Sequence, residues 1–574
     1  MQERRALIAI VLIFLVYVIF TTVFRPGVKP RSTTEGAGSG EATGEVEPAP
    51  VDRTPAGQPD GAQPGAGITG SAGAAQTSGA PLSAVLPAEE MPLTESEVRT
   101  PLYTCRFTSM GGLLTSFILH DYPMNDSGHV ELVPESEVLP FGVALLLKTG
   151  ERIGLSDINW SVTAEALRLE AGSDESLAFE LVTQSGLIVR KTCHFKGDTY
   201  VMDVDISVSG PGSEAVRAVE FGWQSGLGVT EIHRESDDLN NFAGITLSGD
   251  DVEKVKRGDV KKRERIEFAG DIRWSGVKTK YFLAAVLPED GSQVVTGFFH
   301  PGGEAIGMTI ETAGVGTHRY MVYAGPLDHT RLKSLGYGLE RAVDFGWSWI
   351  KPLSKLMFRF ILFCNKYIPN YGLVIIILSL LIKVLFYPLT QKSMKSMRDM
   401  QKLQPKMKEL REVHKGDAQK LNAEMMKLYK EHGVNPVGGC LPMLLQMPVF
   451  IALFQVLSRT IELRQAPFML WIQDLSSPDV IADLPFSLPF IGSNLSLLPI
   501  LMGVAMFVQQ KMQSSDPKQA AMTYMMPVVF TVLFFRFPSG LVLYWLVNNI
   551  LTIGHQYLMV RADRAKEVPA TGGI

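Results

Sequence analysis

The chain has 574 residues, 46% of them hydrophobic, and a formal net charge of −5 at pH 7. This near-neutral net charge says little about partners, although we expect no direct nucleic-acid specificity. These averages combine two unlike halves, because the middle of the chain is typical of a soluble domain whereas residues from about 360 onward are overwhelmingly apolar. The composition therefore indicates a membrane protein with a large domain outside the membrane.

The N-terminal region predicts an anchor followed by a linker. The apolar run Leu7–Phe24 is longer than the ~7–15 residues of a signal-peptide core, and no small-residue cleavage pattern follows it. We therefore expect residues 1–25 to form an uncleaved transmembrane anchor. Residues 26–91 are rich in Gly, Ala and Pro and almost free of large hydrophobic side chains, so they cannot bury enough surface to offset the entropy of ordering. They predict a disordered linker.

Residues 92–342 predict a large antiparallel β-sandwich. In Tyr200–Ser209, Met202, Val204, Ile206 and Val208 alternate with polar residues, which is the pattern of a half-buried strand. Similar runs, separated by turn residues, are Leu187–Phe195, Tyr281–Leu287 and Arg319–Ala324. That spacing favours a sandwich over β-α-β units. Cys105 and Cys193 lie in this domain, and the sequence leaves open whether they form a disulfide.

Residues 343–369 predict an amphipathic helix. Aromatic and aliphatic side chains such as Trp349 and Phe363 alternate there with basic ones such as Lys355 and Arg359. Such a helix suits the surface of a membrane. The alternative is a helix that simply caps the β-domain.

Five further apolar segments within residues 370–560 complete a predicted set of six membrane spans. They are approximately Asn370–Leu389, Val437–Leu457, Leu495–Gln510, Met522–Phe537 and Leu541–Val560. Residues 391–436 hold eleven Lys and Arg against six Asp and Glu, whereas residues 459–485 hold two against four. Because basic loops stay in the cytoplasm, both termini and the short tail 561–574 are expected inside the cell, and the β-domain outside the cytosol.

Lys383 is a charged residue deep inside a predicted span, whereas Arg536 lies at the end of another span and is expected to extend to the membrane surface. Lys383 lies in the run NYGLVIIILSLLIKVLFYPL, and a charge at the centre of a bilayer costs roughly 2.5–3.5 kcal/mol on insertion scales. Intramembrane charges of this kind usually face a polar cavity or a partner. The alternative is that the lysine extends along its helix to the membrane surface, because it lies about eight residues, or ~12 Å, from the cytoplasmic end of the predicted helix.

The basic loop 391–436 predicts a helical hairpin that projects into the cytoplasm. Met394, Met397, Leu403, Met407 and Leu410 form an apolar stripe at roughly helical spacing, and Gly416 and Asp417 suit a helix end and a helix start. The stripe fits a self-packed hairpin. Its methionines and positive charge also suit a partner surface, and the two interpretations are compatible.

Several long motifs resemble one known family, the YidC/Oxa/Alb membrane insertases. The motifs, in order, are Tyr387–Thr390 (YPLT), Leu403–Lys406 (LQPK), Asn435–Pro448 (NPVGGCLPMLLQMP), Glu462–Phe468 (ELRQAPF) and Phe537–Trp545 (FPSGLVLYW). The anchor, linker and β-domain are similar to the Gram-negative branch of that family. The resemblance implies a bacterial inner-membrane protein with a five-helix core around a hydrophilic groove. Lys383 matches the groove's cationic position, where the family usually has arginine.

The resemblance and the helical spacing together predict the groove residues. Ser379 lies one turn before Lys383 and shares its face. The remaining candidates are Tyr544, Trp545, Gln446, Gln509, Gln510, Asn548 and Asn549. The amides also suit hydrogen bonds between helices, and the aromatic residues also suit an interfacial belt. A lipid-facing exit path for substrates is predicted along methionine-rich surfaces, Met443, Met447, Met502, Met506, Met525 and Met526, although such residues more often serve ordinary packing.

The predicted mechanism is insertion without covalent chemistry. No phosphate-binding G-x-x-x-x-G-K-[ST] loop, G-x-S-x-G elbow or helical histidine pair occurs, so we expect no enzyme, cofactor or metal site. The resemblance implies nascent membrane proteins, membrane lipids and the Sec translocon as partners, with ribosome and signal recognition components as candidates at the cytoplasmic loops. Two alternatives remain: an anchored periplasmic carbohydrate-binding or carbohydrate-processing protein, and a solute transporter.

Overall fold

The computed structural model describes residues 87–89, 91–124, 128–231, 235–263, 265–289, 294–300, 305–434, 441–488, 492–513 and 520–567. The described residues other than 415–418 belong to one compact unit. The predicted anchor 1–25, most of the predicted linker, Cys440 and the end of the C-terminal tail lie outside the described residues. The linker prediction is wrong at its last residues, because Pro87 pairs with Thr183 and Ala88 donates to Val182 at 2.9 Å.

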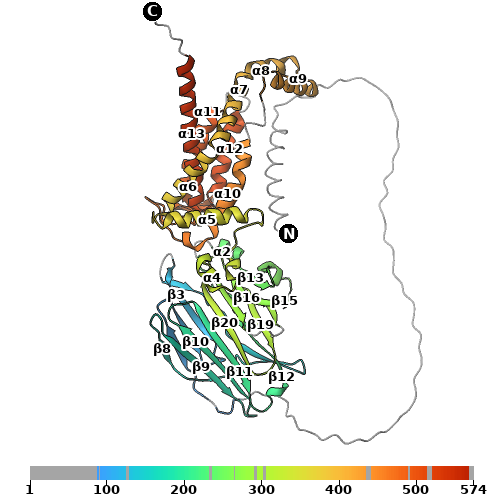
Figure 1. The fold of residues 1–574 in the computed structure, drawn as a ribbon, viewed down its shortest axis with the longest axis vertical. Helices are drawn as coiled ribbons and strands as arrows, with labels where there is room; N and C mark the ends of the chain where they lie inside the picture. The colour runs from blue at the N-terminus through green and yellow to red at the C-terminus, as the bar shows by residue number, and fades with distance from the viewer. Residues whose placement is uncertain are drawn as a thin grey trace, which may run out of the picture. The chain divides into compact units, whose positions relative to one another are not determined.

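Three sheets build the β-domain among the described residues (Figure 1). The largest runs β14 (Asp251–Lys256), β13 (Ala243–Ser248), β16 (Ile272–Lys278), β17 (Phe282–Pro288), β20 (Thr317–Pro326), β11 (Val201–Ser209), β10 (Ile188–Lys196), β9 (Asp174–Val182), β7 (Ser161–Val162). The second runs β15 (Arg265–Gly270), β18 (Val294–Phe299), β19 (Gly307–Ala313), β12 (Val216–Trp223), β5 (Val143–Leu147), β6 (Arg152–Gly154). The third runs β4 (His129–Glu131), β3 (Leu114–Pro123), β2 (Tyr103–Thr108), β1 (Glu95–Arg99), β8 (Ala166–Arg168).

The predicted strands are confirmed where the alternation is strongest. In β11 every second side chain from Met202 onward is buried, and β11 pairs antiparallel with β10 and β20. One pair departs from the antiparallel prediction, because β1 and β8 run parallel. Cys105 and Cys193 are fully buried and both are free thiols, so the disulfide left open by the sequence is not present.

The helices, apart from the short α2 (Glu235–Asn241), α3 (Arg257–Val260) and α4 (His329–Leu335), follow the β-domain in sequence. They are α5 (Lys351–Asn365), α6 (Tyr371–Leu385), α7 (Tyr387–Lys402), α8 (Gln404–Val413), α9 (Ala418–Glu431), α10 (Leu441–Arg459), α11 (Leu497–Gln513), α12 (Ala520–Phe534) and α13 (Ser539–Glu567). Helix α13 packs against α6, α10 and α11, and α11 also packs against α12 (Figure 1). Helix α5 packs against α6 and α10.

Two helical predictions are wrong at their breaks, and proline explains both. The predicted continuous span Asn370–Leu389 ends at Leu385, and α7 starts at Tyr387 with a bend of 64°. The predicted two-helix hairpin 391–436 consists of α7, α8 and α9, with an extra break at Leu403. Pro388 and Pro405 occupy the first turns of α7 and α8, where a missing N–H is tolerated but a continuing helix is not.

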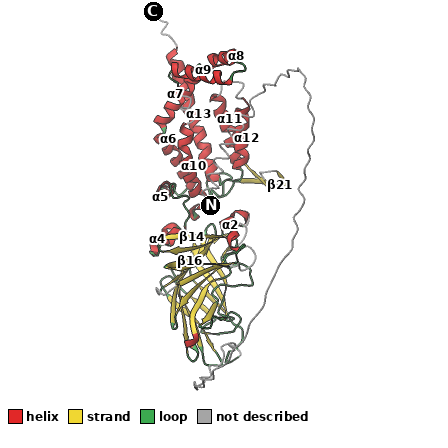
Figure 2. Cartoon of the chain, turned by 90° about the vertical axis from the view of Figure 1, so that its right-hand side faces the viewer, coloured by secondary structure: helices red, strands yellow, loops and turns green. Residues whose placement is uncertain are grey.

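No described helix alone has the length and apolar character of a membrane span, although the bent α6–α7 pair does by both measures. Shorter apolar helices cover Leu445–Arg459, Leu497–Met512 and Met525–Phe534. The predicted span beginning at Leu495 is wrong at its start, because a hairpin of β21 (Val480–Leu488) and β22 (Gly492–Ser496) precedes α11. Figure 2 shows this hairpin extending away from the helices at the end of the bundle where α5 lies.

Candidate functional site

Lys383 forms a hydrogen bond between two helices that are distant in sequence. It lies two residues before the end of α6, not about eight residues from a helix end as predicted. Its side chain is half-buried, and Nζ donates to Oγ1 of Thr552 on α13 at 2.6 Å. Within the described part of the chain, Lys383 has no carboxylate at ion-pair distance. The ammonium is therefore positioned by a neutral hydroxyl and not by a carboxylate of the described residues.

A polar strip on α13 surrounds this contact. Thr552 donates to the carbonyl of Asn548 at 2.6 Å, which orients its hydroxyl toward the lysine. Asn549 and Gln556 are buried, and His555 is half-buried and stacks on Tyr387 at 4.9 Å between ring centroids. The amide Nδ2 of Asn549, Oε1 of Gln556 and both ring nitrogens of His555 have no hydrogen-bond partner in the described structure. Because buried polar atoms normally find partners, this strip is suited to a polar ligand or water.

The sequence did not single out Thr552, His555 and Gln556. Helical spacing carried a signal for them, because residues 545, 548, 552 and 555 recur at three- and four-residue intervals and line one face of α13. Asn548 and Trp545 were predicted, and Thr552 continues their stripe. The structure thus brings Asn548 and Lys383 together through Thr552.

The other predicted groove residues occupy different positions in the bundle. Ser379 is buried, and its hydroxyl donates to the carbonyl of Ile375 within α6 at 2.7 Å. Gln446 on α10 donates to the hydroxyl of the buried Tyr544 at 3.3 Å. Tyr544 lies eight residues before Thr552, or about 12 Å along the helix axis. Gln509 and Gln510 are half-buried on α11.

Trp545, which follows Tyr544 on α13, belongs to an aromatic cluster. It meets Phe450 edge-on at 5.0 Å and Phe534 at 5.4 Å between ring centroids. Of the predicted methionine path, Met502 is fully buried, so it packs inside the bundle, whereas Met525 is 44% exposed. Met447, Met506 and Met526 are half-buried, and the side chain of Met443 lies outside those described.

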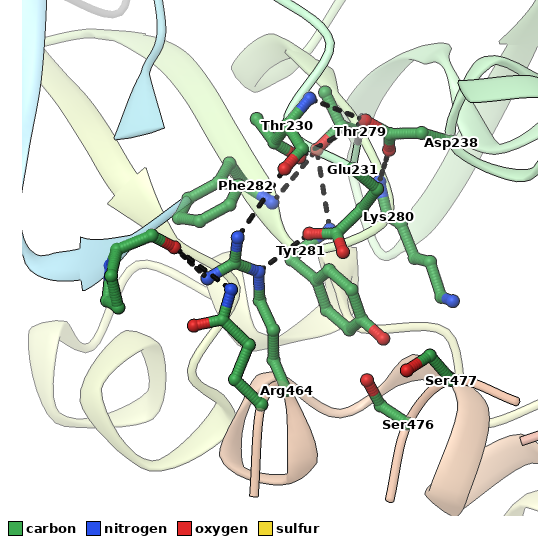
Figure 3. A network of polar contacts seen from close by, with 12 residues as sticks. Thr230, Glu231, Asp238, Thr279, Lys280, Tyr281, Phe282, Arg464, Ser476 and Ser477 are labelled. Carbon is green, nitrogen blue, oxygen red and sulfur yellow. Dashed lines mark hydrogen bonds and ion pairs between the residues drawn. The ribbon is translucent and has the colours of Figure 1, made fainter. Parts of the chain in front are cut away.

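A second polar network joins the loop after α10 to the β-domain (Figure 3). Arg464 is 3% exposed, and its Nε donates to Oε1 of Glu231 at 2.6 Å. Its Nη1 donates to the carbonyl of Pro123 at 3.0 Å, and its guanidinium lies over the ring of Phe282. Burial raises the pKa of Glu231, with Arg464 acting in the opposite direction. The loop after α10 is thus fixed on the β-domain by a buried ion pair.

A second ion pair reinforces this junction. Arg459, at the end of α10, contacts Asp344, which also lies 3.7 Å from Nζ of Lys254. Burial by itself would raise the pKa of Asp344, but Arg459, Lys278 and Lys254 together hold it well below its ordinary value. No group of three His, Cys, Asp or Glu side chains among the described residues is arranged to hold a metal ion.

The fold and site define a class: a helical membrane core with a polar, cationic strip, combined with a large β-domain. The family described as "60Kd inner membrane protein" matches residues 363–566, and the family described as "YidC periplasmic domain" matches residues 95–360. The chain therefore belongs to the YidC family.

Relatives match over nearly the full length. The "Membrane protein insertase YidC" of Pelobacter propionicus is 37% identical, with 97% of this chain and 98% of the relative covered. The protein of the same name from Geobacter metallireducens is also 37% identical, with 99% and 100% covered. A solved structure described as an active YidC insertase with its first transmembrane domain resolved is 20% identical, with a TM-score of 0.35 and 83% of this chain and 95% of that chain covered.

Proposed function

We propose that this chain inserts nascent membrane proteins into the bacterial inner membrane by holding their polar flanks at Lys383 and the α13 strip. Full-length similarity to proteins named as membrane protein insertases supports the activity. One observation supports the mechanism: the half-buried ammonium of Lys383 is bound to the neutral Thr552 hydroxyl and has no carboxylate at ion-pair distance among the described residues.

An uncompensated charge inside a low-dielectric bundle attracts an opposite charge strongly. An acidic or polar flank of a nascent chain that reaches Lys383 supplies that charge and also meets the unpartnered atoms of Asn549, His555 and Gln556. The flank thereby exchanges some of its water for protein partners, which shortens the apolar distance that it must cross. A neutral hydroxyl holds the lysine in place without cancelling the attraction.

The substrate's own hydrophobic segment provides the driving force. Burying it in lipid contributes roughly 25 cal/mol per Å² of apolar surface, and a helical segment satisfies its own backbone hydrogen bonds. No covalent step and no nucleotide is required by this mechanism, so we infer a non-enzymatic function.

We further propose six membrane spans with both termini in the cytoplasm and the β-domain in the periplasm. The excess of basic residues between α6 and α10 supports this orientation. The Sec translocon is a proposed partner in the membrane, and ribosome or signal recognition components are proposed partners of the α7–α9 arm. Part of the apolar stripe in α7–α9 packs internally. Leu403, Tyr429 and Val434 form a small core there, with Met400, Met407 and Met425 around it.

The test is insertion of a single-spanning substrate with an acidic flank into liposomes that contain the purified protein. Wild type is compared with Lys383→Arg, Lys383→Ala and protein-free vesicles. Lys366→Ala serves as the matched control, because it removes an exposed lysine just before the other end of α6. We expect wild type, Lys383→Arg and Lys366→Ala to insert the substrate and Lys383→Ala to lose most of the activity.

Equal insertion by Lys383→Ala and wild type would leave an insertase in which Lys383 has no role in holding substrate. A second experiment uses a substrate whose acidic flank is replaced by lysines. We expect wild type to insert this substrate poorly, because its flank carries the same charge as Lys383. No insertion above protein-free vesicles would contradict the function itself, and solute flux through the same vesicles would then test the transporter alternative.

A further inference from the structure

The loop between α10 and α11 exposes an unusual number of apolar side chains. Exposed fractions are 49% for Met469, 75% for Leu470, 40% for Val480, 43% for Ile481 and 58% for Phe486. These five residues, on the 469–470 turn and on β21, are called the apolar rim below. Large apolar side chains are unfavourable in water, since full burial of each contributes about 1.5–3 kcal/mol.

The charged side chains described in this loop point the opposite way. Asp479 is 4% exposed, and its Oδ2 accepts from the backbone N–H groups of Leu497 and Leu498 at 3.1 and 2.6 Å and from Trp471 Nε1 at 3.0 Å. Asp474 accepts from the backbone and hydroxyl of Ser476, both at 2.8 Å. Leu463 and Leu475 of the same loop are buried, whereas the five residues of the apolar rim remain exposed. The loop thus leaves apolar side chains outside while these two aspartates are held by internal hydrogen bonds, an arrangement that suits apolar surroundings.

The backbone at Leu470 supports the same conclusion. Leu470 has φ of 56°, a left-handed conformation that a branched, non-glycine residue adopts at a cost. Hydrogen bonds on both sides hold the turn, from Phe468 N to Ile472 O at 3.0 Å and from Ile472 N to Met469 O at 3.1 Å. The fold therefore keeps a large apolar side chain directed outward in a strained turn instead of folding it inward.

The apolar rim is held at one end of the helical bundle. Asn370, which caps the start of α6, donates from Nδ2 to the carbonyl of Phe468 at 3.0 Å, and Asp479 caps the start of α11. The rim is thus fixed at the end of the bundle where α5 leads into α6 (Figure 2). Helix α11, which directly follows β22 in the chain, also has an exposed apolar face, formed by Ile500, Leu501, Val504 and Val508.

We propose that the apolar rim lies within the outer leaflet of the bilayer and binds phospholipid acyl chains next to the head groups. The β21–β22 hairpin then acts with α5 as a second interfacial anchor. Because the two elements flank the same end of the bundle, together they fix the depth and tilt of the helices relative to the periplasmic surface. This inference rests on the proposed membrane position of α11, not on the Lys383 mechanism.

The test measures the depth of spin labels in the full-length protein reconstituted into phosphatidylethanolamine and phosphatidylglycerol vesicles. In a Cys364→Ser, Cys440→Ser background, the remaining Cys105 and Cys193 are fully buried and are expected not to react. Single cysteines are placed as Ile481→Cys and Phe486→Cys. Val504→Cys on α11 is the lipid-facing reference, and Asp250→Cys, with a side chain 81% exposed in the β-domain, is the water-facing reference.

We expect the ratio of oxygen to nickel-chelate accessibility at positions 481 and 486 to be several-fold above that at position 250 and below that at position 504. A ratio equal to that at position 250 overturns the proposal. Protection from both reagents also overturns it, because the rim would then be covered by protein. If the label at position 504 also reports water, the membrane position of α11 fails together with the anchor. Insertion by wild type in the same vesicles tests the proposed function separately.

Discussion

The ammonium of Lys383 and the hydroxyl of Thr552 lie 2.6 Å apart, although 169 positions separate the two residues in the chain. The contact connects the last turn of α6 to the middle of α13, and Thr552 in turn donates to the carbonyl of Asn548. This relay defines where the positive charge is held. Without it, the flexible lysine stem could adopt many positions between the helices.

Replacing Thr552 by valine should weaken insertion of substrates with acidic flanks. Valine keeps the shape of threonine but removes the hydroxyl, and a hydrogen bond to a charged group contributes about 1.5–3 kcal/mol. We therefore expect roughly a tenfold lower insertion rate in liposomes. Thr552→Ser is the control and should remain near wild type. Equal rates for the valine and serine variants would show that the hydroxyl does not position Lys383.

Breaking the Arg464–Glu231 ion pair on one side should destabilise the protein strongly. Removal of one partner leaves the other charge buried and unpaired, which costs about 3–5 kcal/mol. Arg464→Leu and Glu231→Gln should each lower the thermal unfolding temperature in detergent, and the double variant should lose less than the sum of the two. Arg106→Leu, which breaks an exposed ion pair with Glu97, is the matched control and should have little effect. Additive losses in the double variant would contradict a coupled pair.

Glu462 predicts a specific pH dependence of stability. Burial raises the pKa of Glu462 to about 7. Because the folded protein then binds this proton more tightly than the unfolded chain, stability should be full below pH 4.5 and fall as the pH rises to 7, by about 3 kcal/mol. Glu462→Gln should remove this part of the dependence and be more stable than wild type at pH 8. The measurement is the difference in unfolding temperature between variant and wild type from pH 4 to 8, and a constant difference would refute the prediction.

Gly372 permits close contact between α6 and the loop after α10. A Cβ atom added at Gly372 would lie 1.9 Å from the ring of Phe468, so Gly372→Ala must displace that ring. We expect a loss of about 1–3 kcal/mol, measured as a lower unfolding temperature. Gly554→Ala on α13 is the matched control, because nothing lies within 4 Å of its added Cβ and alanine favours a helix. Equal behaviour of the two variants would mean that α6 does not approach Phe468 this closely.

The sequence by itself determined the features that depend on local pattern. Alternation in residues 200–209 predicted β11, and the long apolar segments predicted the helical core that carries Lys383. The motifs identified the family that the comparisons confirm. Helix breaks were missed at Phe386 and Leu403, although proline follows each within two positions, because the apolar and amphipathic periodicities continue across them.

Only the tertiary structure decided which residues meet. The Thr552 partner of Lys383, the Glu231 partner of Arg464 and the outward direction of the apolar rim all depend on contacts between distant segments or on turn geometry. Periodicity describes which face of an element is apolar, and it contains no information about which distant polar group that face approaches. Nothing in the sequence distinguishes Thr552 or Glu231 from other threonines and glutamates. The packing of the fold places Thr552 against the ammonium of Lys383 and Glu231 against the guanidinium of Arg464.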